Sequence, residues 1–295
     1  MKNIKIATHN KHFHPDDVFA AAALSILLRE PLEIIRTRNP LIIKEADYVV
    51  DVGGEYDAEK NRFDHHQKGG AGTRENGIPY ASFGLVWKKY GASICGSEEI
   101  ARIIDRKIVE PIDAEDSGVD IIKPVFEGIY PYSCFRVISS LNPTWKERDK
   151  DRNELFGKAA QFAKELILRE IEIGRHFVEG REFVERAYHS AEDKRLIILD
   201  NEYSWKEVMN NYKETLFVIE PNFEAGTWEI IAVRSDMHSF KNRKDMPANW
   251  GGKGSEELIL ETGVPDAFFC HRNLFIAAAR SKEGAIRLAK MAIEK

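Results

Sequence analysis

The chain has 295 residues, of which 43% are hydrophobic and 31% are charged, the composition of a globular protein that can bury a sizeable core. Its formal net charge of −5 argues against a high-affinity, sequence-independent DNA binder, although a local basic patch stays compatible with a nuclease. Three widely spaced cysteines without a CxxC pair argue against a disulfide framework or a cysteine zinc site, and no apolar run reaches the ~18–20 residues that span a bilayer, so we expect a cytoplasmic protein with no membrane partner.

Apolar runs in the N-terminal part predict, in chain order, a strand at 4–8, a helix at 18–30, a strand at 32–38 and a strand at 47–51. The polar loop before the helix ends in Asp16 and Asp17, either of which can cap it. Gly53 and Gly54 break the third strand after Asp51. The order strand, helix, strand, strand is typical of a mostly parallel α/β sheet.

The rest of the chain continues this alternation. A glycine-rich loop at 68–77, of a kind that can close over a ligand, is followed by predicted helices at 80–90, 98–109 and 155–189, then by strands at 196–200, 215–221 and 228–234, a closing segment at 267–279 and a helix at 283–295. We therefore predict an α/β protein in three parts, with a parallel-sheet domain at 1–145, a helical connector at 146–192 and a smaller α/β domain at 193–295.

Side chains of the kinds that bind metals gather in four places in the first domain. These are a loop with His9, His12, His14, Asp16 and Asp17, then Asp51, then Asp64, His65 and His66, and finally Asp113, Glu115 and Asp116. In an open parallel sheet, ligands bind at the carboxyl ends of the strands. The first two places directly follow predicted strands, so we expect all four to converge there.

Imidazole and carboxylate ligands without a thiolate suit Mn²⁺ or another borderline metal, and Mg²⁺ also fits. Two ions about 4 Å apart would activate a water and neutralise charge on phosphoryl oxygens. Asp51 is the candidate bridge between two ions, because it is central in the chain order and lies next to small glycines. By contrast, His12 is more often a solvated loop residue, and Asp17 is equally well explained as a helix cap. The sequence leaves open whether one or two ions bind.

Several motifs in a consistent order resemble the DHH phosphoesterase superfamily and, more closely, the MYG family of the melanocyte-proliferating-gene type, also labelled "metal-dependent protein hydrolase". The matching segments are THNKHFHPDD at 8–17, DYVVDVGGEYD at 47–57, RFDHHQKG at 62–69, YASFGLVWKKYG at 80–91, IDAEDSG at 112–118, LNPTW at 141–145, AVR at 232–234 and FFCHRNLFIAAA at 268–279. The resemblance implies a DHH-type catalytic domain, a C-terminal domain like the DHH-associated substrate-binding domain, and phosphodiester hydrolysis that depends on Mn²⁺ or a related ion.

The resemblance also implies roles for individual residues. The matches to metal ligands are His9, His14, Asp16, Asp51, His65 and Asp113. Asp64 would hold the histidines in place, and His66 would contact substrate or donate a proton to the leaving oxygen. Common DHH enzymes carry aspartates four and six positions after the first histidine, where this chain has Phe13 and Pro15. The exact choice among His9, His12, His14, Asp16, Asp17, Asp113 and Asp116 therefore stays open.

Basic residues and glycines in the second domain predict contacts with substrate, at Arg234, Arg243, Gly251, Gly252, Lys253 and His271. A glycine-rich loop with nearby cations can bind phosphate through backbone N–H groups and charge, although loops rich in lysine and glycine are as often only solvated. Phe240 and Trp250 either stack a base or pack in the core.

Eukaryotic members of the resembling family are described as 3′–5′ RNA exonucleases. The leading interpretation is therefore an exonuclease that uses a metal-activated water on RNA or short oligonucleotides. One alternative, slightly favoured by the acidic net charge, is hydrolysis of a small nucleotide, a dinucleotide or pyrophosphate. Another is a non-catalytic protein that binds a nucleotide or RNA. Neither an HExxH helix nor a nucleophile elbow supports a protein hydrolase. The oligomeric state stays open, with a homodimer among the alternatives.

Overall fold

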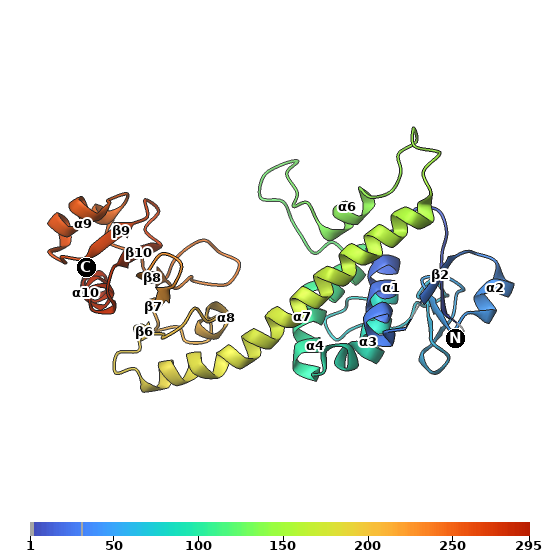
Figure 1. Ribbon diagram of the computed structural model, residues 1–295, viewed down its shortest axis with the longest axis horizontal. Coiled ribbons are helices and arrows are strands. Elements are labelled where there is room, and N and C mark those ends of the chain that lie inside the picture. The colour runs from blue at the N-terminus through green and yellow to red at the C-terminus, as the bar shows by residue number, and fades with distance from the viewer. Residues whose placement is uncertain (1–2, 31) are drawn as a thin grey trace. The chain divides into compact units, whose positions relative to one another are not determined.

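The computed structural model describes residues 3–30 and 32–295. The chain divides into two compact units, residues 1–175 and 176–295, each with its own five-stranded sheet (Figure 1). Both sheets mix parallel and antiparallel strands and carry helices, so the prediction of an α/β protein is confirmed.

The first sheet has the strand order β2-β1-β3-β5-β4. Its strands are β1 (Ile4–Thr8), β2 (Leu32–Arg36), β3 (Tyr48–Val50), β4 (Tyr56–Asp57) and β5 (Arg62–Phe63). Every neighbouring pair is parallel except β4 with β5, which is antiparallel. The mostly parallel sheet was predicted from the sequence. The two-residue strands β4 and β5 were not, because runs this short carry no periodicity.

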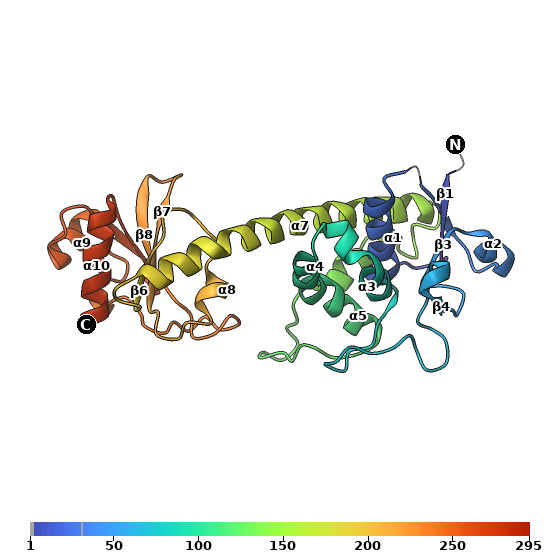
Figure 2. The ribbon, with the colours of Figure 1, turned by 90° about the horizontal axis from the view of Figure 1, so that it is seen from below.

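The helices of the first unit lie on both faces of this sheet. They are α1 (Pro15–Leu28), α2 (Pro40–Glu45), α3 (Ser82–Cys95), α4 (Glu98–Ile104), η2 (Asp105–Val109), α5 (Glu110–Asp116) and α6 (Cys134–Ser139). Figure 2 shows α1 and α3 on one side of the strands and α2 on the other. The predicted helix at 98–109 is α4 followed by a π-helical turn, η2, and the chain then continues without a break into α5.

Helix α1 begins earlier than the sequence predicted. His14 is its N-cap and Pro15 its first residue, so Asp16 and Asp17 lie inside the first turn rather than at the cap. Proline is favoured at this position because its missing N–H would have no helical partner. The Asp17 carboxylate accepts a hydrogen bond from the His14 backbone N–H at 2.9 Å. Both aspartates are fully buried, which points their carboxylates into the protein rather than into solvent.

Helix α7 spans Arg152–Ser190, close to the predicted range of 155–189. The division between the two compact units falls within it, between Arg175 and His176. The assignment of 146–192 as a separate connector stays a prediction. Among the described residues, no helix is both long enough and apolar enough to cross a membrane.

The second unit has a sheet of order β6-β7-β8-β10-β9, in which β6 and β7 are parallel and the other pairs antiparallel. Its elements are β6 (Leu196–Ile198), α8 (Lys206–Met209), β7 (Phe217–Asn222), β8 (Thr227–Ala232), η3 (Ala248–Trp250), α9 (Ser255–Thr262), β9 (Ala267–Cys270), β10 (Ile276–Ala279) and α10 (Lys282–Glu294). Phe217 on one face packs with Leu288 of α10, and Val218 on the other packs with Trp205 beside α8. Trp250 is fully buried in the first of these cores, so it packs in the core and does not stack a base.

Candidate metal centre

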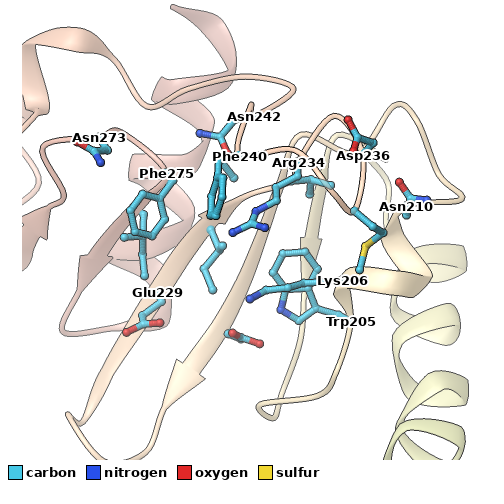
Figure 3. Close-up of a pocket in the computed structure, with 16 residues that line it drawn as sticks. Trp205, Lys206, Asn210, Glu229, Arg234, Asp236, Phe240, Asn242, Asn273 and Phe275 are labelled. Atoms are coloured by element: carbon cyan, nitrogen blue, oxygen red, sulfur yellow. The ribbon is translucent and has the colours of Figure 1, made fainter. Parts of the chain in front are cut away.

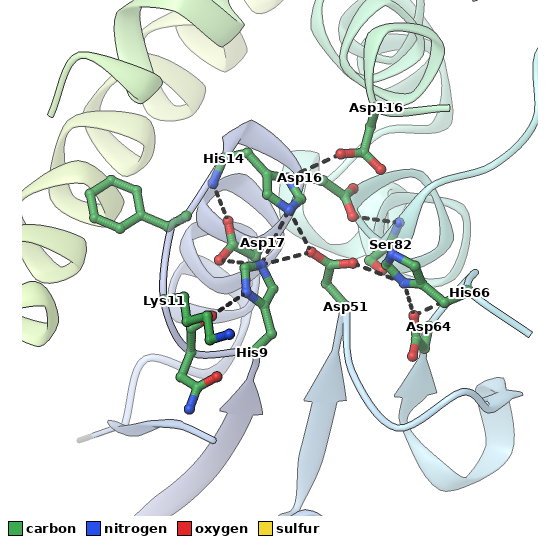
Figure 4. A network of polar contacts seen from close by, with 12 residues as sticks. His9, Lys11, His14, Asp16, Asp17, Asp51, Asp64, His66, Ser82 and Asp116 are labelled. Atoms are coloured by element: carbon green, nitrogen blue, oxygen red, sulfur yellow. Dashed lines mark hydrogen bonds and ion pairs between the residues drawn. The ribbon is translucent and has the colours of Figure 1, made fainter. Parts of the chain in front are cut away.

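Three neighbouring parallel strands end at the same edge of the first sheet, and each is followed by a polar side chain. β1 is followed by His9, β3 by Asp51 and β5 by Asp64. Figure 4 shows these three residues just beyond the strand ends. All three are at most 4% exposed, so this edge of the sheet holds buried ionisable groups rather than a solvated loop.

The Asp51 carboxylate lies between two pairs of histidines. Its Oδ2 is 3.3 Å from His9 Nε2 and 3.2 Å from His14 Nε2, and its Oδ1 is 3.5 Å from His65 Nε2 and 3.4 Å from His66 Nδ1. Asp51 is 1% exposed, and neither oxygen accepts a hydrogen bond of normal geometry from the described residues. A buried carboxylate without such partners is costly unless positive charge lies next to it.

The first group of ligand atoms comprises His9, His14, Asp17 and Asp51, all within 4.8 Å of one another. His9 Nε2 is 3.2 Å from His14 Nε2 and 3.2 Å from Asp17 Oδ2. The imidazole nitrogens of His9 and His14 therefore face each other across a small space that both carboxylates also face.

The second group comprises Asp16, His65 and Asp116. His65 Nε2 is 3.1 Å from Asp116 Oδ2 and 3.9 Å from Asp16 Oδ2, and it also faces Asp51. Backbone N–H groups of Ser82 and Phe83, at the start of α3, donate to the two oxygens of Asp16. These bonds fix Asp16 and orient it toward the second group.

The charges of this centre depend on one another. Burial alone would lower the histidine pKa values, but the neighbouring carboxylates raise that of His9 to about 9, that of His14 to about 11 and that of His65 to about 10. Burial would raise the pKa of Asp51, but the three histidines lower it well below its usual range. Burial and the negative charge of Asp51 raise the pKa of Asp16. Without other cations, protons on the imidazoles would have to balance these carboxylates.

The side chains present fit a divalent cation. Asp17 Oδ2, both oxygens of Asp51 and His65 Nε2 are buried without a hydrogen-bond partner among the described residues, although all face other ligand atoms. Imidazole nitrogen and carboxylate oxygen, with no thiolate, are the donors expected for Mn²⁺ or a similar ion. Asp51 belongs to two of the three groups of ligand atoms that could hold a metal, the first group and a third group with Asp64, His65 and His66. This is expected of a carboxylate shared between two ions.

Asp64 holds the second histidine pair in place. Its Oδ1 accepts hydrogen bonds from the backbone N–H groups of His65 and His66, and Oδ2 accepts one from Gly54 N–H. Asp64 Oδ1 is also 2.7 Å from His66 Nδ1, which leaves His66 Nε2 free to face outward from a side chain that is 60% exposed. The hydrogen bond with Asp64 raises the pKa of His66.

Asp113 is turned away from the metal-type groups. It forms an ion pair with Arg74 and accepts a hydrogen bond from Gly84 N–H, and it belongs to none of the three groups formed by the described residues. One turn further along α5, Asp116 faces His14 and His65 instead. The sequence interpretation included Asp116 and Asp17 only as alternatives. His12 is exposed and outside these groups.

The candidate substrate residues of the second unit lie in different environments. Arg243 donates to the backbone carbonyls of Met209, Tyr212 and Thr215, which is a structural role. Lys253 pairs with Glu261, and His271 Nδ1 accepts from Asn273 N–H. Gly251 and Gly252 follow the buried Trp250. Arg234 instead lines a cavity.

Comparison with known proteins decides the family. Residues 5–293 match the model MYG1_exonuc, described as "Uncharacterised protein family (UPF0160)". The chain belongs to this family. The MYG1 family also includes the similar "MYG1 exonuclease" of Homo sapiens, 32% identical over 97% of this chain and 85% of the human protein. The "MYG1 protein" of Dictyostelium discoideum is 30% identical over 98% of this chain and 96% of its own length, and "MYG1 protein YER156C" of Saccharomyces cerevisiae is 29% identical over 98% and 95%. The resemblance to the MYG family drawn from the motifs is confirmed.

One residue of the motif LNPTW positions the loop that carries His9 and His14, although it lies far from that loop in the sequence. Asn142, in LNPTW, accepts a hydrogen bond from Phe13 N–H at 3.0 Å and donates to Phe13 C=O at 2.8 Å. Phe13 lies between His9 and His14 in the sequence, so Asn142 fixes the loop that carries both imidazoles. The polar character of Asn142 alone did not indicate this role.

We expect Asn142→Ala to weaken Mn²⁺ binding by roughly 10–100-fold, the usual effect of removing a residue that orients metal ligands. Isothermal titration calorimetry on the purified chain measures the change. The matched control is Asn153→Ala, which removes an exposed asparagine in α7. Equal affinity in the two variants would contradict a positioning role for Asn142.

The histidine pKa values predict how stability depends on pH. Because His9, His14 and His65 hold their protons more tightly in the folded chain than at their ordinary value of 6.5, the stability they contribute is complete below about pH 6.5. It is lost as the pH rises toward 9–11. We expect the unfolding temperature of chelator-treated protein to fall between pH 6.5 and 9, and saturating Mn²⁺ to reduce that fall. An unfolding temperature that rises over this range in the treated protein would show the sign to be wrong.

Proposed function

We propose that this chain is a divalent-metal-dependent phosphodiester hydrolase of the DHH type that acts as a 3′–5′ exonuclease on RNA or short oligonucleotides. The observation that carries the proposal is the Asp51 carboxylate, with one oxygen toward His9 and His14 and the other toward His65 and His66. Relatives from several mammals are named exonucleases, which supports the same class of reaction.

Two cation positions follow from the grouping of ligand atoms. His9, His14, Asp17 and Asp51 would hold the first ion, and Asp16, His65 and Asp116 the second. Asp51 would also face the second ion, because its Oδ1 lies 3.5 Å from His65 Nε2. This assignment keeps five of the six ligands expected from the family resemblance, adds Asp17 and uses Asp116 in place of Asp113. The reason is that Arg74 and Gly84 already satisfy Asp113.

Bound divalent cations would supply a nucleophile at neutral pH and offset negative charge on the phosphoryl group. The chain's own residues do the positioning. Asp51 keeps the two histidine pairs at a fixed separation, and Asp64 fixes the segment that carries His65 and His66. Asp16 is itself fixed by the start of α3, so the ligand set is rigid before substrate arrives.

His66 is the residue suited to proton transfer. Asp64 engages its Nδ1 and raises its pKa, which favours the form of the ring that also carries a proton on the outward-facing Nε2. As water attacks phosphorus and the bond from phosphorus to the leaving oxygen breaks, that proton passes to the leaving oxygen and yields a hydroxyl product.

In this proposal residues 1–145 form the catalytic domain, and the domain at 193–295 binds substrate. Arg234 is retained as a substrate contact because its guanidinium lines a cavity. Arg243 is not retained, since its donors are used by backbone carbonyls.

The proposal predicts that Asp51→Asn abolishes hydrolysis. Replacing one carboxylate oxygen by an amide removes the charge shared between the two cation positions, so we expect a loss of at least about a thousandfold in kcat/KM, comparable to removing a principal electrostatic group. The substrates are a 3′-labelled and a 5′-labelled RNA, a dinucleotide and pyrophosphate, each with Mn²⁺. The matched control is Asp120→Asn, because Asp120 is an exposed residue outside the metal-type groups of the described chain.

The products decide between the candidate substrates. Stepwise release of mononucleotides from the 3′ end, lost in Asp51→Asn and kept in Asp120→Asn, supports the proposal. Hydrolysis of pyrophosphate alone would rule out the exonuclease. No hydrolysis of any substrate, with RNA still bound, would favour a non-catalytic binding protein.

His66→Gln separates proton transfer from metal binding. Since general acid catalysis contributes typically 10²–10⁴-fold, we expect kcat to fall within that range. The number of bound Mn²⁺ ions, measured by elemental analysis, should not change. In the wild type, the alkaline limb of the kcat profile should report loss of the His66 proton, and this limb should disappear in the variant. An unchanged alkaline limb would assign the proton to another group.

A further inference from the structure

The second unit contains a cavity of about 600 Å³ that is independent of the metal-type residues. It lies against one face of the sheet, over β7, β8 and β10, and the loop after β8 contributes to its wall. Figure 3 shows Arg234 and Phe240 entering this space from one side and Glu229, Lys206 and Trp205 from the other. Its volume is in the range of cavities that bind small molecules.

Aromatic and aliphatic residues form half of the wall. Ile231 and Ile276 come from the sheet, and Phe275 and Trp205 lie beside them. Phe240, at the mouth, is 87% exposed, and its only described ring contact is with the Arg234 guanidinium, 4.7 Å from the ring centre. An exposed aromatic ring at the mouth of a cavity is a suitable surface for stacking a planar ligand.

Three carboxylates line the same cavity, and one of them, Asp236 in the loop after β8, accepts a hydrogen bond from the His238 backbone N–H. Glu220 on β7 and Glu229 on β8 are directly opposite in the antiparallel register and both line the cavity. Asn222 donates to one oxygen of Glu229, and Glu220 Oε2 is buried without a partner among the described residues. Burial and the charge of Glu229 raise the pKa of Glu220 to about 7, even though Trp205 opposes this shift. Like charges placed opposite each other are unfavourable unless donors are supplied to them.

Two cations line the cavity wall, and the charge of one of them, Lys206, opposes the raised pKa of Glu220. Within the described ranges, neither Arg234 nor Lys206 makes an ion pair, although each lies over an aromatic ring. The cavity thus combines an apolar surface for a flat ring, acceptors for N–H groups and cations for an anion.

We infer that this cavity binds the guanine base of a nucleotide, with the base edge on the Glu229 carboxylate and the phosphate toward Arg234. Guanine offers two adjacent N–H donors, N1–H and the exocyclic amino group, and an ionised carboxylate accepts both without donating in return. Adenine and cytosine place a ring acceptor beside their amino group, and uracil places carbonyls on both sides of its N–H. A carboxylate would repel those acceptors, so the cavity selects against these bases.

This inference deepens the proposed function by naming a preferred base, and it rests on that function for the idea that nucleic acid is the substrate. The two are tested separately. Nucleotide binding is measured on the full chain in the presence of a chelator, where hydrolysis does not occur. Hydrolysis is measured with Mn²⁺ on an oligonucleotide that contains no guanine.

The binding experiment uses calorimetric titration with 5′-GMP, 5′-IMP, 5′-AMP, 5′-UMP and guanosine. IMP differs from GMP only in lacking the exocyclic amino group. We expect GMP to bind at one site, IMP severalfold more weakly, and AMP and UMP at least tenfold more weakly. Guanosine, which lacks the phosphate, should also bind more weakly than GMP.

Variants assign each preference to a residue. Glu229→Gln should lower GMP affinity at least tenfold and bring it close to that of AMP. Arg234→Ala, a change at an exposed side chain, should remove the difference between GMP and guanosine. The matched control is Glu257→Gln on α9, an exposed glutamate outside the cavity, which should bind all five ligands like the wild type.

The proposal is overturned if GMP does not bind, if GMP and UMP bind equally, or if Glu229→Gln keeps the full preference for GMP. It is also overturned if spermidine binds in place of GMP, because the cavity would then be a site for organic cations. Each of these results leaves the proposed hydrolase intact, whereas loss of Mn²⁺-dependent hydrolysis with normal GMP binding would refute the hydrolase alone.

Discussion

The site depends on keeping one carboxylate, that of Asp51, ionised in the interior. An isolated buried carboxylate is strongly disfavoured, and here His9, His14 and His65 supply the positive charge that holds its pKa low. The backbone is adapted to this position. Asp51 has a φ of 55°, which turns the chain at the end of β3, and its N–H donates to Phe63 C=O on β5. A strand end, a tight turn and a neighbouring strand therefore aim the side chain between the histidines.

The sequence predicted the site residues at the ends of strands better than the site residues on helix α5. His9 and Asp51 follow apolar runs, and parallel neighbouring strands must end at one edge, so their proximity could be foreseen. Asp113 and Asp116 lie three residues apart on α5, so both turn toward roughly the same side of the helix. Only the packed structure shows that Arg74 forms an ion pair with Asp113, whereas Asp116 lies next to His65.

In the second unit, residue type alone did not distinguish an arginine that stabilises the fold from one that can contact a ligand. Arg234 and Arg243 lie in the same loop region and looked equally suited to a phosphate. The structure differs for a physical reason, because three backbone carbonyls surround Arg243 and use its donors. The position of these carbonyls follows from how α8 and β7 pack, which no local pattern encodes. Short elements such as α2 and α9 escaped prediction for a similar reason, since tertiary packing outweighs their weak periodicity.

The metal centre and the cavity of the second unit share one feature. In both, buried carboxylate oxygens lack hydrogen-bond donors among the described residues, and this indicates which ligand binds. The difference in chemistry comes from the partners of those acceptors. Around Asp51 the partners are imidazoles, and three groups of possible metal ligands overlap there. Around Glu220 and Glu229 they are aromatic rings and the amide of Asn222, and the described residues of the second unit form no such group. Of the three carboxylates of the cavity, Glu229 already accepts from Asn222 and Asp236 from the His238 backbone N–H, so they do not form the ligand set that encloses a divalent ion. They are sufficient for a flat ring with two adjacent N–H groups, which is why a metal is proposed for the first unit and a guanine base for the second.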